Sequence, residues 1–153
     1  MSYTYENKQD LIAEGDYEVI VDKIERKTLP SGKEKIGINF RIRSDVEGQK
    51  YGNRIVFEDI WQEKDHPEFF NRRRINQILG TQSIKEGTVF EDINDVIKVL
   101  EGSFLQIHIV AVFDDYRGTD VNKVSYYKSS NFKPHSMGGA DTTIALTEEE
   151  LPF

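Results

Sequence analysis

Residues 35–43, KIGINFRIR, alternate apolar with polar positions along their whole length. The apolar positions are Ile36, Ile38, Phe40 and Ile42, and between them stand Lys35, Gly37, Asn39, Arg41 and Arg43. Alternation with a period of two is typical of a β-strand that buries one face and exposes the other. We therefore predict a sheet with an apolar back and a cationic front, and a front of this kind favours contact with a polyanion.

The segments on either side of this stretch predict two more strands. Residues 16–28 carry apolar groups on both faces, which indicates a long, bent strand that changes partners. The turn signal LPSG at residues 29–32 joins it to residues 35–43 as a hairpin, because Pro presets one dihedral and Gly permits positive φ. Gly37 favours a bulge or a tight bend within the second strand. Residues 54–62 form the third strand, and periodicity leaves open which of its faces is buried.

A helical region is expected next. Asp65 and Pro67 are typical of a helix start, and apolar residues at near-helical spacing continue to Leu79, before Gly80. Residues 93–100 predict a second short helix. Arg72, Arg73 and Arg74 point about 100° apart on a helix and are expected to form a solvated face.

Two further strands, at residues 104–113 and 121–132, complete the order. Three strands, a helical segment and two strands is the order of an OB-fold, a small closed β-barrel. We predict an all-β class, a five-stranded OB-fold barrel with a helix between strands 3 and 4, as one domain over residues 1–133. Residues 134–153 are poor in large apolar groups, so we expect a disordered, flexible tail there.

Composition excludes several classes of protein. The chain has no cysteine, so disulfides and thiolate metal sites are excluded and a reducing cytoplasm fits. It lacks a run of about 18 apolar residues, so we expect no membrane association. The three histidines are scattered, and no Gly-rich phosphate loop or nucleophile constellation is present. We therefore expect no cofactor, no metal and no catalytic activity.

The net charge of −7 argues at first against nucleic acid, but the charge is unevenly distributed. Residues 134–153 contain no Lys or Arg and four of the 27 acidic residues, which leaves 23 acidic and 20 basic residues in the body. A nearly balanced body can still hold a basic stripe on one face.

The C-terminal residues Glu148, Glu149, Glu150, Leu151, Pro152 and Phe153 have the composition of a compact linear ligand. A partner can hold Phe153 in an apolar pocket and its terminal carboxylate with Arg or Lys. An ordinary solvated acidic end is the alternative. The Leu-Pro-Phe that follows the acids favours a docking peptide.

This tip resembles the end of bacterial single-stranded DNA-binding proteins, in which several acids precede a hydrophobic residue, Pro and Phe. The body resembles a phage-borne family of small OB-fold proteins encoded among replication and recombination genes, through its strand order and the stretches GDYEVIVDKIERK and GKEKIGINFRIR. The resemblance implies single-stranded DNA binding in a bacterial host cytoplasm, with the tip recruiting replication or recombination proteins. The tail is shorter and poorer in Gly and Pro than in typical bacterial members.

Single strands are held by cations along the phosphate path and by aromatic faces under the bases. The cationic candidates are Lys23, Lys27, Lys33, Lys35, Arg41, Arg43, Arg54, Lys123 and Lys128. The stacking candidates are Trp61, Tyr51, Tyr116, Tyr126 and Tyr127. A lone Trp is more often a core residue than a platform, and Tyr126 and Tyr127 point to opposite faces of a regular strand, so at most one of them faces the ligand.

Two other classes of function remain open. One is an OB-fold adaptor that binds proteins and no nucleic acid. The other is a metal-dependent nuclease, in which Asp16 and the Glu25-x-Lys27 pair would hold metal and water. Glu-x-Lys is frequent by chance in a chain that is 31% charged. The sequence is compatible with a homo-oligomer and leaves the choice between DNA and RNA open.

Overall fold

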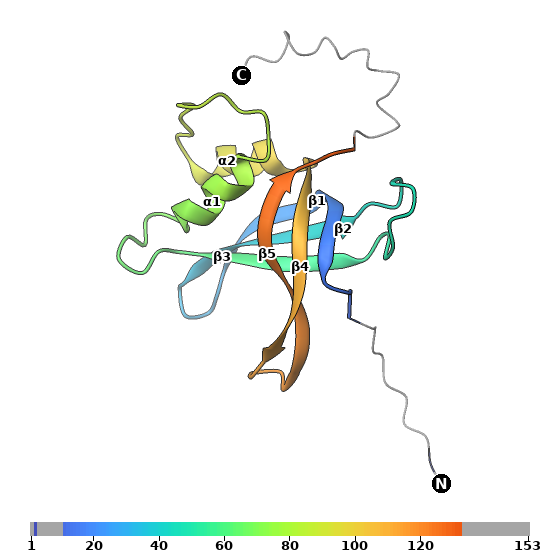
Figure 1. The fold of residues 1–153 in the computed structure, drawn as a ribbon. Coiled ribbons are helices and arrows are strands. Elements are labelled where there is room, and N and C mark those ends of the chain that lie inside the picture. Colours follow the sequence, from blue (N-terminus) through green and yellow to red (C-terminus); the bar gives the residue numbers. More distant parts are fainter. Residues whose placement is uncertain (1, 3–10, 133–153) are drawn as a thin grey trace.

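The computed structural model describes residue 2 and residues 11–132 of the chain (Figure 1). Within these residues the elements are β1 (Gly15–Thr28), β2 (Glu34–Ile42), β3 (Ile55–Trp61), α1 (Arg72–Leu79), α2 (Ile93–Leu100), β4 (Phe104–Asp114) and β5 (Thr119–Ser129). All five predicted strands are present, and α2 has the predicted bounds. The predicted tail, residues 134–153, lies outside the described residues.

The strands form one antiparallel sheet in the order β3-β2-β1-β4-β5. The central strand, β1, pairs with β2 through residues 19–28 and with β4 through residues 15–20. Its register shifts between Val21 and Lys23, and a bulge of this kind bends a strand. The prediction of a long first strand that changes partners is confirmed. At Gly37 the pairing of β2 with both neighbours is regular.

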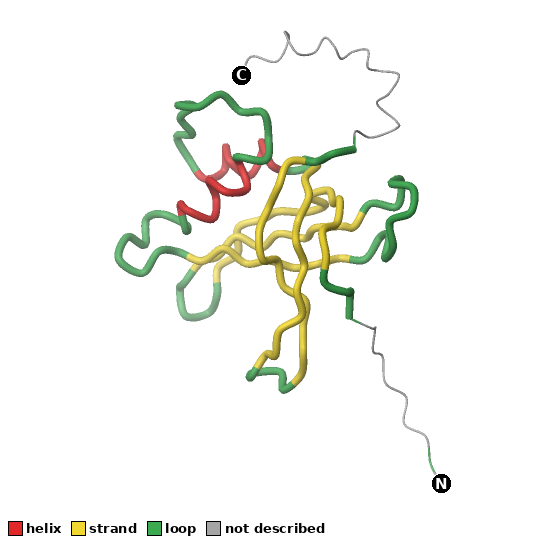
Figure 2. The backbone as a smooth tube through the Cα atoms, viewed as in Figure 1, coloured by secondary structure: helices red, strands yellow, loops and turns green. Residues whose placement is uncertain are grey.

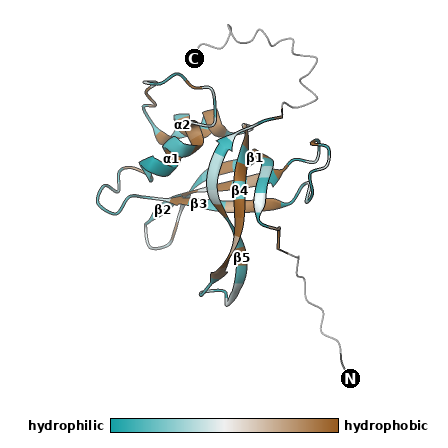
Figure 3. Cartoon of the chain, viewed as in Figure 1, coloured by the Kyte–Doolittle hydropathy of each residue, from teal (hydrophilic) through white to brown (hydrophobic). Residues whose placement is uncertain are grey.

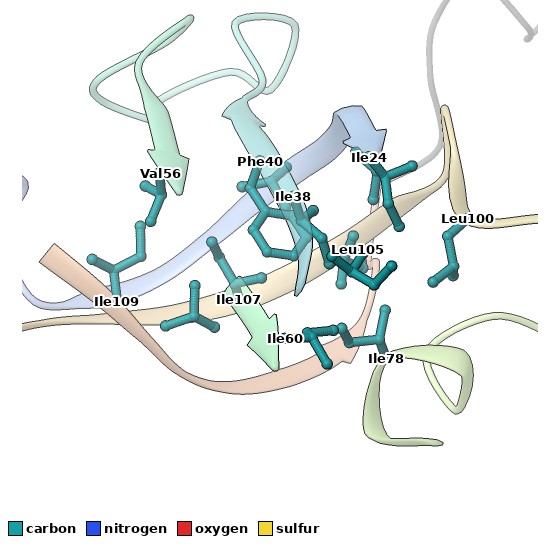
Figure 4. Close-up of a cluster of buried hydrophobic side chains, with 14 of the residues drawn as sticks. Ile24, Ile38, Phe40, Val56, Ile60, Ile78, Leu100, Leu105, Ile107 and Ile109 are labelled. Carbon is teal, nitrogen blue, oxygen red and sulfur yellow. The ribbon is translucent and has the colours of Figure 1, made fainter. Parts of the chain in front are cut away.

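The apolar face predicted for β2 is the centre of the core. Ile36, Ile38, Phe40 and Ile42 are each at most 2% exposed. Figure 4 shows Ile38 and Phe40 clustered with side chains of β3 and β4, and Figure 3 shows hydrophobic residues concentrated along the strands, β4 above all. Each buried side chain of this size contributes about 1.5–3 kcal/mol, so the alternation alone supplies much of the folding energy of β2.

The two ends of the sheet approach each other across a polar seam between β3 and β5. The Tyr127 hydroxyl on β5 donates to Glu58 Oε2 on β3 at 2.8 Å. The Arg74 guanidinium on α1 donates to the same carboxylate and, at 3.3 Å, to the Val124 carbonyl oxygen on β5. Side chains thus bridge β3 and β5, and the five strands form an OB-like β-barrel with a helical insert, as predicted. The expectation of a solvated arginine face is wrong for Arg74.

The helix start predicted at Asp65 and Pro67 is wrong. The chain from residue 63 to 71 is a loop, and α1 begins at Arg72, where the Asn71 side chain accepts from the Arg74 amide at 3.1 Å. Phe70 is only 6% exposed and belongs to the core, so the loop turns inward one residue before the helix cap. Figure 2 shows α1 and α2 together at one side of the strands, and both helices contribute buried residues to the core.

Candidate nucleic-acid interface

The outward-pointing residues of β1, β2 and β3 form one continuous surface, which we call the front face. Its members are Asp22, Lys23, Glu25 and Lys27 on β1, Lys35, Gly37, Asn39 and Arg41 on β2, and Ile55, Phe57, Asp59 and Trp61 on β3. The strand register sets them in rows: Lys27 pairs with Lys35, which pairs with Trp61, and Lys23 pairs with Asn39, which pairs with Phe57. Each of these two rows therefore has a cation on β1 and an aromatic ring on β3.

The structure decides which face of β3 is buried. Val56 and Ile60 are 2% and 3% exposed and belong to the core, whereas Phe57 is 68% exposed and Trp61 is 43% exposed. Four strand positions separate the two rings, a rise of about 13 Å along β3. Trp61 is therefore a surface residue. Phe57 is absent from the candidates predicted from the sequence, although it shares its face of β3 with the candidate Trp61.

The basic side chains of the front face are all within 4 Å of a carboxylate. Arg41 contacts Asp22 through two hydrogen bonds of 2.9 and 3.2 Å. Lys35 Nζ lies 3.2 Å from Asp59 Oδ2. Glu25 Oε2 lies 3.7 Å from Lys23 Nζ and 3.6 Å from Lys27 Nζ. With four cations and three carboxylates, the front face has a formal charge of only +1.

A groove of about 650 Å³ continues the front face beyond β3. One wall is β3 with Phe57 and Trp61, and the other is the β4–β5 hairpin with Arg117 and Lys123. Lys123 is exposed, and the turn beside Arg117 holds Tyr116, which is 97% exposed. Figure 1 shows this hairpin extending away from the barrel. The groove therefore brings Arg117 and Lys123 to the side of the molecule where Phe57 is exposed.

Arg43 is not part of the front face, although the sequence placed it beside Arg41. It is 4% exposed, and its guanidinium donates to Asp45 at 2.8 and 2.9 Å and to the Phe132 carbonyl oxygen at 2.6 Å. It also lies 3.8 Å from the buried carboxylate of Glu18. β2 ends at Ile42, so the alternation does not extend to Arg43, which instead ties the end of β5 to the barrel.

Tyr126 and Lys128 lie on a different surface, formed by the outer sides of β1, β4 and β5. Tyr126 stacks on His108 with ring centroids 4.6 Å apart, and Lys128 Nζ lies 3.2 Å from Asp16 Oδ2. His108 Nδ1 is 2.6 Å from Asp16 Oδ1. This hydrogen bond raises the pKa of His108 above its usual 6.5 and lowers the pKa of Asp16 below its usual 3.8. These residues form a self-contained polar cluster.

The remaining candidates do not belong to the front face. Lys33 is exposed in the β1–β2 turn. Tyr51 is half-buried and packs edge-on against Tyr17, and the Arg54 guanidinium lies 5.8 Å from the Tyr51 ring centroid. Tyr127 is in the seam, where burial first and then the Glu58 charge raise its pKa far above the ordinary value of 10.0. Both rings pack against other aromatic side chains of the barrel, Tyr51 against Tyr17 and Tyr127 against Phe40.

The nuclease arrangement is not assembled. Asp16 and Glu25 are nine positions apart on the one strand β1, which would be about 30 Å along a fully extended strand. Asp16 contacts His108 and Lys128, whereas Glu25 lies between two lysines of the front face. Among the described residues, no three His, Asp or Glu side chains are grouped to hold a metal ion. No described helix is long and apolar enough to cross a membrane.

Comparison with known proteins gives one family. The profile described as "Protein of unknown function (DUF669)" matches residues 2–139, which include every strand and helix of the barrel. No curated protein matches the chain. Because the match covers well over half of the sequence, the chain belongs to the DUF669 family.

Proposed function

We propose that this protein is a non-catalytic, sequence-tolerant single-stranded DNA-binding protein of phage DNA replication and recombination, at work in the cytoplasm of a bacterial host. In this proposal the front face and the adjoining groove bind the single DNA strand. The C-terminal residues 148–153, which lie outside the described residues, recruit replication or recombination proteins.

The exposure of Phe57 and Trp61 between cationic neighbours carries this proposal. Two large aromatic rings on the outer side of a strand add nothing to the core, and Lys35 Nζ lies 5.1 Å from the centroid of the Trp61 ring. Bases stack on such rings with about 1–3 kcal/mol each, whatever their identity, because every base has a π-face. Lys23 and Lys35 stand in the same rows as Phe57 and Trp61, and Arg41 pairs with Ile55 beyond the Phe57 row. All three cations can meet the phosphates.

The position of the groove is consistent with a path for single-stranded DNA across the β-sheet. OB-fold barrels bind oligonucleotides on the face of strands 2 and 3, between the β1–β2 and β4–β5 loops. Here those loops carry Lys33 on one side and Tyr116 with Arg117 on the other. The resemblance of the tip to that of bacterial single-stranded DNA-binding proteins supports the same function independently of the barrel.

The test is a fluorescence-anisotropy titration of a labelled thymidine oligonucleotide with the full chain, with the variants Phe57→Ala and Trp61→Ala, and with Tyr126→Ala as the matched control from the surface of β1, β4 and β5. We expect each front-face variant to lower affinity by about 5- to 150-fold, which corresponds to one lost stack. The control should bind like the wild type. Equal affinities for all four proteins would exclude the front face as the binding surface.

A further inference from the structure

We infer that Asp22, Glu25 and Asp59 make the front face selective for single strands over duplex, by occupying the cations that a duplex needs. This inference rests on the proposed function. It concerns specificity, which the presence of cations and aromatic rings does not by itself explain.

The three carboxylates stand within the binding surface itself. Asp59 lies on β3 between Phe57 and Trp61 and holds Lys35 from the neighbouring strand at 3.2 Å. Asp22 lies at the bulge of β1 and holds Arg41 with paired hydrogen bonds. Their side chains are 42% and 36% exposed, so neither belongs to the core. Glu25 in turn contacts both Lys23 and Lys27.

A duplex and a single strand make different demands on this surface. The bases of a duplex are stacked inside, so a sheet face can meet only its phosphates, and affinity depends on the number of cations that release counterions. On the front face each cation must first exchange a carboxylate for a phosphate. The net gain is small because four cations face three carboxylates.

A single strand can use the contacts that the carboxylates leave open. Its unstacked bases reach Phe57 and Trp61, and stacking does not depend on displacing an acid. The two rings are the most exposed apolar groups of β3. Carboxylates paired with the cations of this surface therefore weaken phosphate-only binding much more than binding through bases, and they also repel a second, misplaced phosphate chain.

The experiment compares the full-length wild type with the double variant Asp22→Asn/Asp59→Asn and with both single variants. The control is Glu86→Gln/Glu91→Gln, which makes the same change in net charge at exposed positions in the loop between α1 and α2. Dissociation constants are measured for a thymidine oligonucleotide and for a mixed-sequence duplex of equal length, at 50 and 200 mM NaCl. Thermal unfolding shows whether each variant is folded.

We expect the wild type to prefer the single strand, and the double variant to bind duplex about tenfold or more tightly than the wild type while its affinity for the single strand rises about threefold or less. The duplex salt slope should steepen by about 0.9 for each released cation. The control variant should keep the wild-type ratio of the dissociation constants for duplex and single strand. Equal gains for both ligands or an unchanged duplex affinity would overturn the inference alone. A wild type that binds both ligands equally would overturn the inference together with the single-strand specificity of the proposed function. A wild type that binds no single strand at 50 mM salt would instead remove the proposed function.

Discussion

Lys35 and Trp61 are direct partners across β2 and β3, and the lysine ammonium lies 5.1 Å from the centre of the indole ring. The same ammonium is 3.2 Å from Asp59 Oδ2, on the strand that carries Trp61. One cation therefore links an aromatic platform to an acid at one end of the front face. Both faces of β2 thus have a distinct role, since Ile36 and Ile38 on the other side are buried in the core.

Arg41 and Arg43 should differ sharply although they are two residues apart. Arg41→Ala is expected to weaken binding to thymidine oligonucleotides about three- to tenfold and to change stability by less than about 0.5 kcal/mol, because its pair with Asp22 is exposed. Arg43→Ala should cost about 3–5 kcal/mol, since it leaves the buried Glu18 carboxylate without its cation. Urea unfolding and anisotropy titration of both variants measure the two effects. If Arg43→Ala lost affinity for the oligonucleotide without losing stability, the assignment of Arg43 to the buried interior would be contradicted.

The polar seam should contribute to the stability of the barrel. Glu58→Ala leaves both the Tyr127 hydroxyl and the Arg74 guanidinium without their shared acceptor, and we expect a loss of about 2–4 kcal/mol in the free energy of unfolding. Tyr127→Phe removes one hydrogen bond and should cost about 1 kcal/mol. Asp59→Ala, at the next position but on the exposed face, is the control and should be nearly neutral. Equal effects at Glu58 and Asp59 in urea unfolding would argue against a bridging role.

The polar cluster of Asp16, His108, Tyr126 and Lys128 predicts that the stability of the protein depends on pH. The hydrogen bond to Asp16 raises the pKa of His108 above 6.5, so the folded state binds the proton more tightly than the unfolded state. The pair of protonated His108 with Asp16 therefore stabilises the fold in full below pH 6.5. This stabilisation is lost as the pH rises through the higher pKa that His108 has in the folded state. At the acid end, the contribution from the lowered pKa of Asp16 disappears as the pH falls below its usual 3.8.

We therefore expect His108→Gln to destabilise the protein more at about pH 5.5 than at about pH 8.5. The measurement is urea unfolding of wild type and variant at both pH values. His66, which is exposed in the loop before α1, supplies the control variant His66→Gln. An equal loss at both pH values would mean that the charged pair with Asp16 contributes no stability.

Removal of Pro152 and Phe153 should separate the two proposed activities. The truncated chain is expected to bind thymidine oligonucleotides as the full chain does, and to lose binding to a replication or repair enzyme that recognises the tip of bacterial single-stranded DNA-binding proteins. Asp141→Asn, which leaves the last residues intact, is the control. Surface plasmon resonance with the immobilised enzyme gives the comparison, and undiminished binding by the truncated chain would refute the docking role.

Much of the fold could be predicted from period and turn chemistry. The alternation from Ile36 to Ile42 determines both the location of β2 and the face that it buries, because only one face is apolar. In β3 both faces carry large apolar groups, so local pattern cannot tell Phe57 from Val56. That choice depends on pairing with β2, which is a long-range property of the sheet.

The errors have a similar origin. Phe69 and Phe70 fit a helical spacing, yet Phe70 is drawn into the core and delays the helix to Arg72. Arg43 continues the polar parity of β2, but the strand ends one residue earlier and the side chain turns to buried acceptors from distant parts of the chain. Tertiary contacts of this kind leave no mark in a local sequence pattern.

The central claim is that unpaired bases stack on the front face, and the fluorescence of Trp61 tests it most directly. Trp61 is the only tryptophan in the chain, so its emission reports on this surface alone. Titration of the full chain with a thymidine oligonucleotide in low salt should quench that emission saturably, and a duplex of equal length should quench it far less. Emission that stays unchanged while an oligonucleotide of any sequence is added would contradict the account.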